Sequence, residues 1–209
     1  MENINYPSSR HPISDGIVGP SGDSVTIGDG ELRIRKTSEA DLPAIMRIHS
    51  MAFGQDTEAD LVAAILADPS AEPVLSLMAL EDGRPVGHIL FSAARLDEPE
   101  RDTPAAILAP LAIVPDAQRR GLGGKLIETG LVHLSETGTD LVFVLGHPDY
   151  YPRFGFEPAG QYGLLAPYPI ADEHADAWMV QALRPGIIGS VRGTIICCDA
   201  LSRPELWRE

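Results

Sequence analysis

Residues 108–134 read LAPLAIVPDAQRRGLGGKLIETGLVHL, and this stretch decides the fold. From Leu111 to Val114 the chain is apolar over the length of a strand, and Pro115-Asp116 stops the run. From Leu122 onward the apolar residues recur with helical spacing, at Leu126, Ile127, Leu131 and Leu134. The stretch therefore predicts a strand, a short turn and an amphipathic helix.

The turn between the two elements is rich in glycine and basic residues. It consists of Gln118, Arg119, Arg120, Gly121, Leu122, Gly123, Gly124 and Lys125. The first turn of a helix leaves backbone N–H groups without partners and carries the positive end of the helix dipole. Glycine removes the side chains that would keep an anion from the backbone, and the basic residues add charge. The turn is predicted to cradle a pyrophosphate.

Two better-known phosphate loops do not fit this pattern. A Walker A loop needs Ser or Thr after its lysine, whereas Lys125 is followed by Leu126. A dinucleotide fingerprint needs a glycine where Leu126 stands. The remaining pattern, Gln118-x-x-Gly121-x-Gly123 after an apolar strand, resembles the acyl-CoA pyrophosphate loop of the GNAT superfamily of N-acetyltransferases. The alternative is an ordinary glycine-rich turn from strand to helix.

Length and composition set the class of protein. The 209 residues suffice for one domain and a tail, and 44% hydrophobic residues indicate a globular chain. No apolar run approaches the ~20 residues that cross a bilayer, and the N-terminus has no secretory signal pattern. The two cysteines, Cys197 and Cys198, are adjacent and provide no disulfide framework. A cytoplasmic protein without a membrane partner is expected.

The net charge of −14 argues against a nucleic-acid partner. It also repels an anionic cofactor at long range, so the local basic cluster must outweigh it at close range. The acidic remainder favours a cationic acceptor. No spacing of His11, His49, His133 or His174 with other ligands suggests a metal site, and residues 172–176 are expected to be a solvated loop.

The N-terminal half predicts two helices before the sheet continues. Residues 1–30 are expected to be a flexible tail that ends in a short strand at Ser24–Ile27, followed by a domain over residues 31–209 with its first strand at 31–36. Capping-box patterns begin at Ser38 and Thr57. The first helix would run to about Phe53 and the second would end at Asp68-Pro69. Their expected buried residues are Leu42, Ile45, Met46, His49, Leu61, Val62, Ile65 and Leu66.

The remaining elements follow from turn signals and apolar runs. Asp82-Gly83 predicts a hairpin turn, and Pro110 predicts a bulge or an edge within the central strand. Further strands are expected at residues 140–145, 177–183 and 187–198, with a short helix or turn at 150–156. Cys197 and Cys198 would then point to opposite faces of the last strand. That strand, if exposed, could pair across a homodimer.

This order of elements is the order of the GNAT fold, and the resemblance runs from about Glu31 to at least Ala182. It includes PVGHILFS at residues 85–92 and VLGHPDYYPRFGFEPA at 144–159, the latter similar to a bacterial branch of small-substrate acetyltransferases. The resemblance implies an α/β (α+β) fold whose mixed central sheet is splayed at the cofactor site, with helices on both faces.

The resemblance also implies where acetyl-CoA would bind. Pantetheine would run beside Leu111–Val114 like an added strand, and an N–H near Leu111 or Ala112 would polarise the thioester oxygen. The implied cofactor-binding residues are Leu111, Ala112, Ile113, Val114, Gln118, Arg119, Arg120, Gly121, Leu122, Gly123, Gly124, Lys125, His147 and Tyr151. The alternative for residues 111–114 is a continuous sheet core.

For the leaving thiolate, the resemblance points to a tyrosine four residues before Gly-Phe. Tyr151 stands there, and a hydroxyl with an ordinary pKa of about 10 could donate a proton. Tyr150 is the rival if the register differs by one residue, and a packing role is the alternative for Tyr151. The family's Asn seven residues earlier is Val144 here, so His147 or the backbone would replace its contact with pantetheine.

The base that deprotonates the amine is the least determined part of the site. Candidates are Glu58, His88, Asp97 and Glu98. Glu58 could equally be a first-turn carboxylate that favours the helix dipole, and His88 a satisfied core histidine.

The functional prediction is acetyl transfer from acetyl-CoA to a primary amine of a small molecule or protein. Direct attack in a ternary complex is expected because no nucleophilic cysteine lies near the loop or Tyr151. The alternatives are a non-catalytic acyl-CoA-binding or sensing module and a structural interaction domain.

Overall fold

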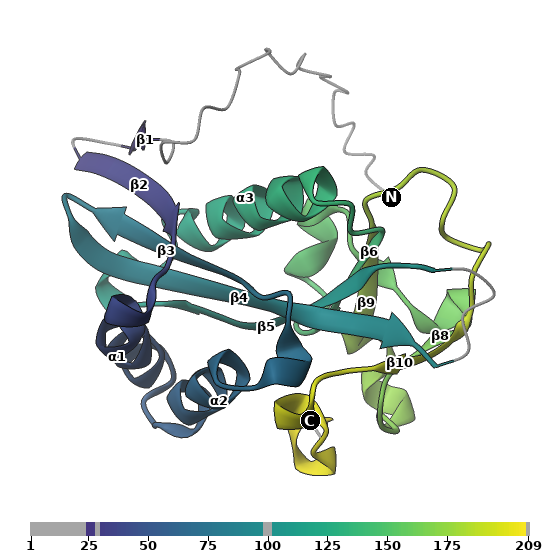
Figure 1. The fold of residues 1–209 in the computed structure, drawn as a ribbon. Coiled ribbons are helices and arrows are strands. Elements are labelled where there is room, and N and C mark those ends of the chain that lie inside the picture. The colour runs from purple at the N-terminus through teal and green to yellow at the C-terminus, as the bar shows by residue number, and fades with distance from the viewer. Residues whose placement is uncertain (1–23, 28–29, 98–101, 208–209) are drawn as a thin grey trace, which may run out of the picture.

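A computed structural model describes residues 24–27, 30–97 and 102–207 of the chain. Within these residues a twisted, mixed sheet of ten strands forms the centre of the molecule. Helices α1 (Leu42–Phe53) and α2 (Thr57–Leu66) cover one face, and α3 (Leu122–Glu136) covers the other (Figure 1). The predicted α/β architecture with helices on both faces is confirmed.

The sheet runs in the order β1-β2-β3-β4-β5-β6-β9-β7, with β10 paired to β4 and β8. The strands are β1 Ser24–Ile27, β2 Gly30–Lys36, β3 Leu75–Glu81, β4 Arg84–Leu96, β5 Ala105–Ile113, β6 Leu141–Leu145, β7 Glu157–Pro158, β8 Leu164–Leu165, β9 Trp178–Ala182 and β10 Gly193–Ile196. The parallel pairs are β5–β6 and β8–β10, and the other ladders are antiparallel.

Two local predictions in the sheet are confirmed. Asp82 and Gly83 connect β3 to β4 with positive φ angles of 50° and 79°, which a two-residue hairpin turn of this hand requires. Between β4 and β5, Phe91 pairs with Leu108 and Ile89 with Leu111. Ala109-Pro110 therefore faces the single residue Leu90, so the bulge lies where proline cannot donate to the ladder.

The two capping predictions have different outcomes. The capping box at Ser38 is present, with the Asp41 carboxylate accepting from the Ser38 N–H at 2.8 Å. The box at Thr57 is wrong, because Asp56 is the cap residue and Thr57 already belongs to α2. The Asp56 carboxylate accepts from the Ser50 hydroxyl at 2.6 Å, which ties the start of α2 to α1.

The buried stripe of the first two helices is narrower than predicted. Ile45, His49, Val62 and Ile65 are buried as expected, whereas Met46, Leu61 and Leu66 are only partly buried. Leu42 is 36% exposed, and the prediction that it is buried is wrong. Leu42 and Leu66 line a pocket between the helices, so neither closes against the sheet.

The C-terminal region departs most from prediction. The strand expected at residues 177–183 is β9, but of residues 187–198 only Gly193–Ile196 form a strand. Cys197 and Cys198 follow that strand, and both are buried free thiols, so the prediction of opposite faces is wrong. Gly193 and Thr194 of β10 pair with β8, and Ile195 and Ile196 pair with β4, so much of this strand is already used within the sheet.

Some predictions fall on residues outside the described ranges. Most of the expected tail, residues 1–23 and 28–29, lies there, as do His11 and Glu98. Within that tail, Ser24–Ile27 forms the predicted strand and pairs with β2. None of the described helices has the length and apolar character needed to cross a bilayer.

Candidate functional site

Strands β5 and β6 are paired along only part of their lengths, and the boundary between these two strands is called the seam here. The two strands pair in parallel only from Ala105 with Leu141 to Ile107 with Phe143. Beyond these pairs β5 continues to Ile113 and β6 to Leu145, and both strands are described in full. The predicted splay is therefore present, and the facing edges leave backbone groups without ladder partners.

The bulge at Ala109-Pro110 lies where the seam opens. A bulge bends its strand and increases the local twist, and this one comes two residues after the last pair of β5 with β6, at Ile107. Leu111 and Ala112 follow the bulge on the open part of β5, paired on their other side with Ile89 and His88 of β4. A ligand with amides of its own could occupy the open side as an added strand.

The glycine loop leads from β5 into α3 as predicted. A 3-10 turn at Pro115–Ala117 precedes it, Arg119 and Gly121 have φ angles of 60° and 80°, and α3 begins at Leu122. The first hydrogen bond of the helix runs from the Lys125 N–H to the Gly121 carbonyl at 3.2 Å. The N–H groups of residues 122–124 have no hydrogen-bond partner among the described residues, which suits an anion.

The three glycines of the loop have different roles. A Cβ on Gly121 would meet nothing within 4 Å, so glycine serves the positive φ angle there. A Cβ on Gly123 would lie 2.6 Å from the Tyr150 hydroxyl, and one on Gly124 would lie 3.0 Å from the ring of Phe154. The second and third glycines therefore admit aromatic side chains that pack on the start of α3. The sequence reading missed this packing.

The polar side chains of the loop are not equally available. The Arg120 guanidinium forms a bidentate ion pair with the Glu81 carboxylate. The Gln118 amide donates to the Ile113 carbonyl at 3.0 Å and so holds the loop against the end of β5. Arg119 and Lys125 make no ion pair with any described residue, so their charges remain for a ligand.

Tyr151 lies where β6 leaves the sheet. It begins a 3-10 turn at Tyr151–Phe154, as predicted for residues 150–156. A Cβ on Gly146, the residue after β6, would lie 2.3 Å from the Tyr151 ring. Burial raises the pKa of Tyr151, so its hydroxyl keeps its proton at neutral pH. No described residue hydrogen-bonds to this hydroxyl.

Tyr150, the rival, points elsewhere. Its hydroxyl lies against Gly123 at the start of α3, and Arg153 stacks over its ring at 4.5 Å. The rings of Tyr150 and Tyr151 meet edge to face at 5.2 Å. The two tyrosines therefore contact different parts of the region, Tyr150 the loop at Gly123 and Tyr151 the end of β6 at Gly146.

The remaining cofactor candidates differ in exposure. His147 follows the end of β6 with 74% of its side chain exposed and accepts weakly from the Asp149 N–H at 3.4 Å. Val144 is buried in the sheet, so no side-chain amide is available at the position of the family's Asn.

Two of the candidate bases are accessible carboxylates. Glu58 lies in the first turn of α2, and its oxygens are 3.3 Å from the Gln55 amide. The first turn also favours a carboxylate through the helix dipole, the alternative role for Glu58. Asp97 accepts from the Thr194 N–H at 3.0 Å and thereby holds β10 beside β4. This contact gives Asp97 a structural role.

His88 is buried with a second histidine that the sequence did not connect to it. The Nδ1 atom of His88 lies 2.9 Å from Nε2 of His49 on α1, and its Nε2 lies 2.8 Å from the Ser76 hydroxyl. Burial lowers the pKa of His88 to about 3, and the neighbouring His49 adds to this shift. Burial also lowers the pKa of His49, to about 4. Both rings are neutral at physiological pH, which makes His88 a weak base.

No cluster of three or more His, Cys, Asp or Glu that could hold a metal ion occurs in the described part of the chain. The seam and loop instead present backbone groups, two unpaired basic side chains and a protonated tyrosine. This arrangement can bind an elongated molecule that carries both amides and a diphosphate.

The chain is similar to known proteins in sequence and in fold. A family model for the acetyltransferase (GNAT) domain matches residues 33–159. Over 165 residues the chain is 50% identical to the uncharacterized N-acetyltransferase YjhQ of Escherichia coli K12, covering 78% of this chain and 90% of that protein. It is 32% identical to the uncharacterized N-acetyltransferase YhbS of the same strain, covering 78% and 93%.

Solved structures agree with the sequence relatives. The crystal structure of Escherichia coli YhbS in complex with CoA aligns with a TM-score of 0.73 at 28% identity, over 90% of this chain and 97% of that one. A GNAT family acetyltransferase from Brucella melitensis in complex with acetyl-CoA aligns with a TM-score of 0.64 at 28% identity, over 81% and 97%. The chain belongs to the GNAT acetyltransferase family.

Proposed function

We propose that this enzyme transfers an acetyl group from acetyl-CoA to a primary amine of a small molecule or protein. The observation that carries the proposal is the open seam that leads directly into the unpartnered N–H groups at the start of α3. These two features would hold the pantetheine and the diphosphate of one donor molecule. The CoA and acetyl-CoA in the two aligned crystal structures support this donor.

The donor would bind through the backbone more than through side chains. Pantetheine amides would pair with the open edge of residues 111–114, and the diphosphate would meet the N–H groups of residues 122–124. Arg119 and Lys125 would add charge near the diphosphate, and Gln118 would hold the loop in place. Arg120 would contribute less unless it left Glu81.

The reaction proposed is direct attack on the thioester. The amine nitrogen forms a bond to the acetyl carbon, the carbon–sulfur bond breaks, and the amine loses one proton while the thiolate gains one. An N–H near Leu111 or Ala112 would stabilise charge on the carbonyl oxygen. Tyr151 would supply the proton to sulfur, because its raised pKa keeps the hydroxyl protonated beside the seam.

Glu58 would accept the proton of the amine, directly or through water. Among the described residues its carboxylate has only the long contacts with Gln55, whereas His88 is buried and neutral with a pKa of about 3. The base must also reach the amine, and the His88 ring is fully buried with both nitrogens hydrogen-bonded, whereas Glu58 is partly exposed.

A panel of amines, assayed for release of free thiol from acetyl-CoA, tests the proposal. The expected result is acceptor-dependent thiol release together with an acetylated product of matching mass. The non-catalytic sensing module is the second candidate, since the loop would bind an acyl-CoA with or without chemistry. Saturable binding of acetyl-CoA without release for any amine would favour that module and contradict the transferase.

A further inference from the structure

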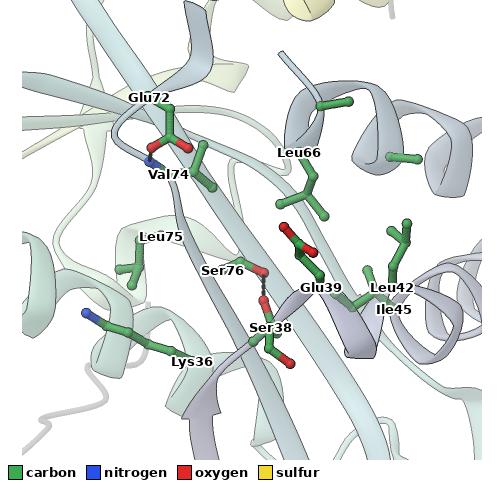
Figure 2. A pocket seen from close by; sticks show the side chains of 13 residues that line it. Lys36, Ser38, Glu39, Leu42, Ile45, Leu66, Glu72, Val74, Leu75 and Ser76 are labelled. Atoms are coloured by element: carbon green, nitrogen blue, oxygen red, sulfur yellow. Dashed lines mark hydrogen bonds between the residues drawn. The ribbon is translucent and has the colours of Figure 1, made fainter. Parts of the chain in front are cut away.

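A second pocket lies on the opposite half of the sheet from the seam. It has a volume of about 590 Å³ and lies between the start of α1, the end of α2 and the adjoining ends of β2 and β3 (Figure 2). This volume is within the range of small-molecule sites. Since β4 separates β3 from β5, the pocket is about two strand spacings, roughly 10 Å, from the edge of the seam.

The walls of the pocket are mainly apolar. They include Leu42, Ile45, Ala63, Leu66, Val74 and Leu75. Leu42 is 36% exposed and Leu66 is only partly buried, although both belong to amphipathic helices. An apolar ligand would cover hydrocarbon surface that these helices leave open, which is a favourable contribution to binding.

One carboxylate crosses the pocket without a partner. Glu39 points from the 3-10 turn at Glu39–Asp41, just before α1, toward Leu66, whereas the Lys36 side chain extends away from it (Figure 2). The Glu39 side chain makes no hydrogen bond or ion pair with any described residue and is exposed to solvent. The Glu72 carboxylate is turned to its own loop, where it accepts from the Val74 N–H at 3.0 Å.

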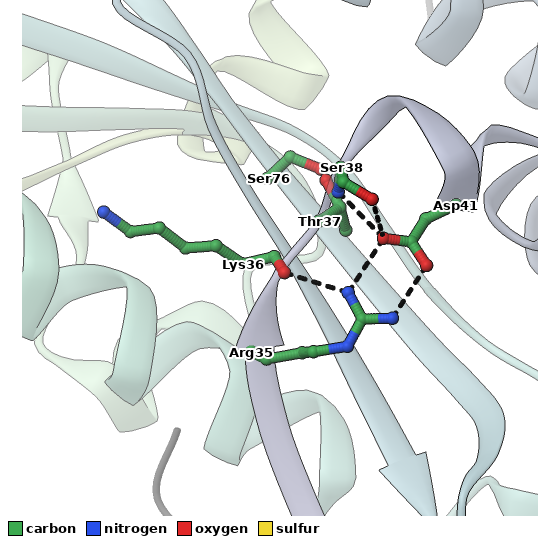
Figure 3. Close-up of polar contacts among 6 residues, drawn as sticks. All are labelled: Arg35, Lys36, Thr37, Ser38, Asp41 and Ser76. Carbon is green, nitrogen blue, oxygen red and sulfur yellow. Dashed lines mark hydrogen bonds and ion pairs between the residues drawn. The ribbon is translucent and has the colours of Figure 1, made fainter. Parts of the chain in front are cut away.

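The guanidinium of Arg35, four residues before Glu39, is already paired with another carboxylate. Arg35 donates to Asp41 at 2.8 and 2.7 Å, and Asp41 also accepts from the Ser38 N–H and hydroxyl at 2.8 and 3.0 Å (Figure 3). These contacts lower the pKa of Asp41, and the hydrogen bonds from Arg35 make the largest contribution. Arg35 is therefore held away from Glu39, whose charge remains for a ligand.

Two hydroxyl groups, those of Thr37 and Ser76, form a polar patch in the pocket wall. The Thr37 hydroxyl donates to the Ser76 hydroxyl at 2.6 Å, and both residues line the pocket. Ser76 also lies 2.8 Å from Nε2 of His88, which connects the pocket wall to the buried histidine pair. A change at Ser76 would therefore alter the surroundings of the His88 ring.

We propose that this pocket binds a small organic cation with an apolar body, at a site separate from the donor seam. The ammonium group pairs with Glu39, and the apolar body lies on Leu42, Ile45 and Leu66. A neutral molecule of the same shape gains the apolar contacts but not the charge-assisted hydrogen bond. The inference does not depend on acetyl transfer, because the pocket shares no residue with the seam or the glycine loop.

Titration calorimetry without acetyl-CoA tests this site, with 2-phenylethylamine as the cation and 2-phenylethanol as its neutral match. The amine is expected to bind about two- to fivefold more tightly than the alcohol, because Glu39 is exposed to solvent. Glu39→Gln should remove that difference, and Glu205→Gln, an exposed carboxylate on the C-terminal turn, should leave it unchanged. Ala63→Phe, which fills the pocket, should abolish binding of both ligands.

Nitrogen-15 NMR of the histidine rings then locates the bound amine. Saturable movement of the His88 signals, with those of His147 unchanged, is the expected result. Equal affinity for amine and alcohol would overturn the proposal, as would amine binding that survives Glu39→Gln or an absence of amine binding. Loss of acetyl transfer with this binding intact would refute the proposed function alone, since no step of the binding test uses acetyl-CoA.

Discussion

The open seam between β5 and β6 and the buried pair of His49 on α1 and His88 on β4 are neighbours with opposite characters. His88 is paired in register with Ala112, so the two regions are one strand apart. In the seam the polar groups belong to the backbone and lack ladder partners, whereas the histidines hydrogen-bond to each other and to Ser76. The many unused backbone groups at its open edge suit the seam to binding, whereas in the buried pair His49 Nδ1 is the one ring nitrogen without a hydrogen-bond partner among the described residues.

The comparison explains why residue type alone misidentifies the chemistry. Histidine is the most common general base, yet burial lowers the pKa of His88 to about 3. The same physical effect raises the pKa of Tyr151, because burial disfavours whichever form carries charge. Burial therefore makes His88 a poor base and keeps Tyr151 a proton donor.

The largest expected effect is that of Tyr151→Phe. Removing the hydroxyl should lower kcat by about 10²- to 10⁴-fold, the usual contribution of general acid catalysis, while the affinity for CoA changes less than about twofold. Steady-state kinetics and calorimetry measure the two quantities. Tyr150→Phe is the matched control and should lower kcat less than about tenfold, because that hydroxyl faces the loop. A larger loss of kcat in Tyr150→Phe than in Tyr151→Phe would assign the general acid to Tyr150.

The histidine pair should make stability depend on pH. Both folded pKa values, about 4 and about 3, lie below the unfolded value near 6.5, so the unfolded chain binds more protons in this window. The free energy of unfolding should be undiminished above pH 6.5 and fall as the pH drops toward 4, by up to about 1.4 kcal/mol per pH unit for each histidine. Urea denaturation across this range measures the slope.

The double variant His49→Leu/His88→Met should flatten that slope, and His133→Gln, at the end of α3, should preserve it. Below about pH 4 the carboxylates, including Asp41 beside Arg35, add a loss of their own. A stability that is level from pH 6.5 to 4, or a slope that the double variant leaves intact, would show that the pair is not held neutral by burial.

Gly146→Ala should disturb the seam from within. The new Cβ would lie 2.3 Å from the Tyr151 ring, so the ring must move or the strand end must shift. Overpacking of this kind costs about 1–3 kcal/mol of stability, and turnover should fall because the proton donor is displaced. Gly160→Ala is the control, since its Cβ would meet nothing within 4 Å. Equal melting temperatures and rates for both variants would place Tyr151 outside the reaction.

The smallest expected effect separates Arg119 from Arg120. Arg119→Ala removes an unpaired charge and should weaken CoA binding about fivefold at low salt, with a smaller loss at high salt. Arg120→Ala should have less effect, because Arg120 is paired with Glu81 and must leave that partner before it can bind phosphate. Calorimetry at two salt concentrations measures both. A larger loss for Arg120→Ala would show that the ion pair opens when CoA binds.

The sequence predicted those parts of the fold that local pattern determines. The hairpin at Asp82-Gly83, the bulge at Pro110 and the strand leading to the glycine loop depend on turn chemistry and short-range periodicity, and all are present. The capping box at Ser38 is present for the same reason, whereas at Thr57 a tertiary contact between Asp56 and Ser50 decided where the helix begins.

Contacts between distant residues could not be predicted in this way. His49 and His88 are 39 residues apart, as are Glu81 and Arg120, and nothing in their local patterns pairs them. The packing of Tyr150 and Phe154 on Gly123 and Gly124 was also hidden, because glycine suits an anion site and close aromatic contact equally well. The place of β10 between β4 and β8 depends on the whole chain.

Hydrogen exchange with and without CoA tests the central claim most directly. If the N–H groups of the glycine loop bind the diphosphate and the open edge of β5 binds pantetheine, CoA should slow amide exchange across residues 111–125. Residues 75–81 of β3, which lie on the other side of β4, should exchange as before. Unchanged exchange across residues 111–125 at saturating CoA, or protection confined to another part of the chain, would contradict the account.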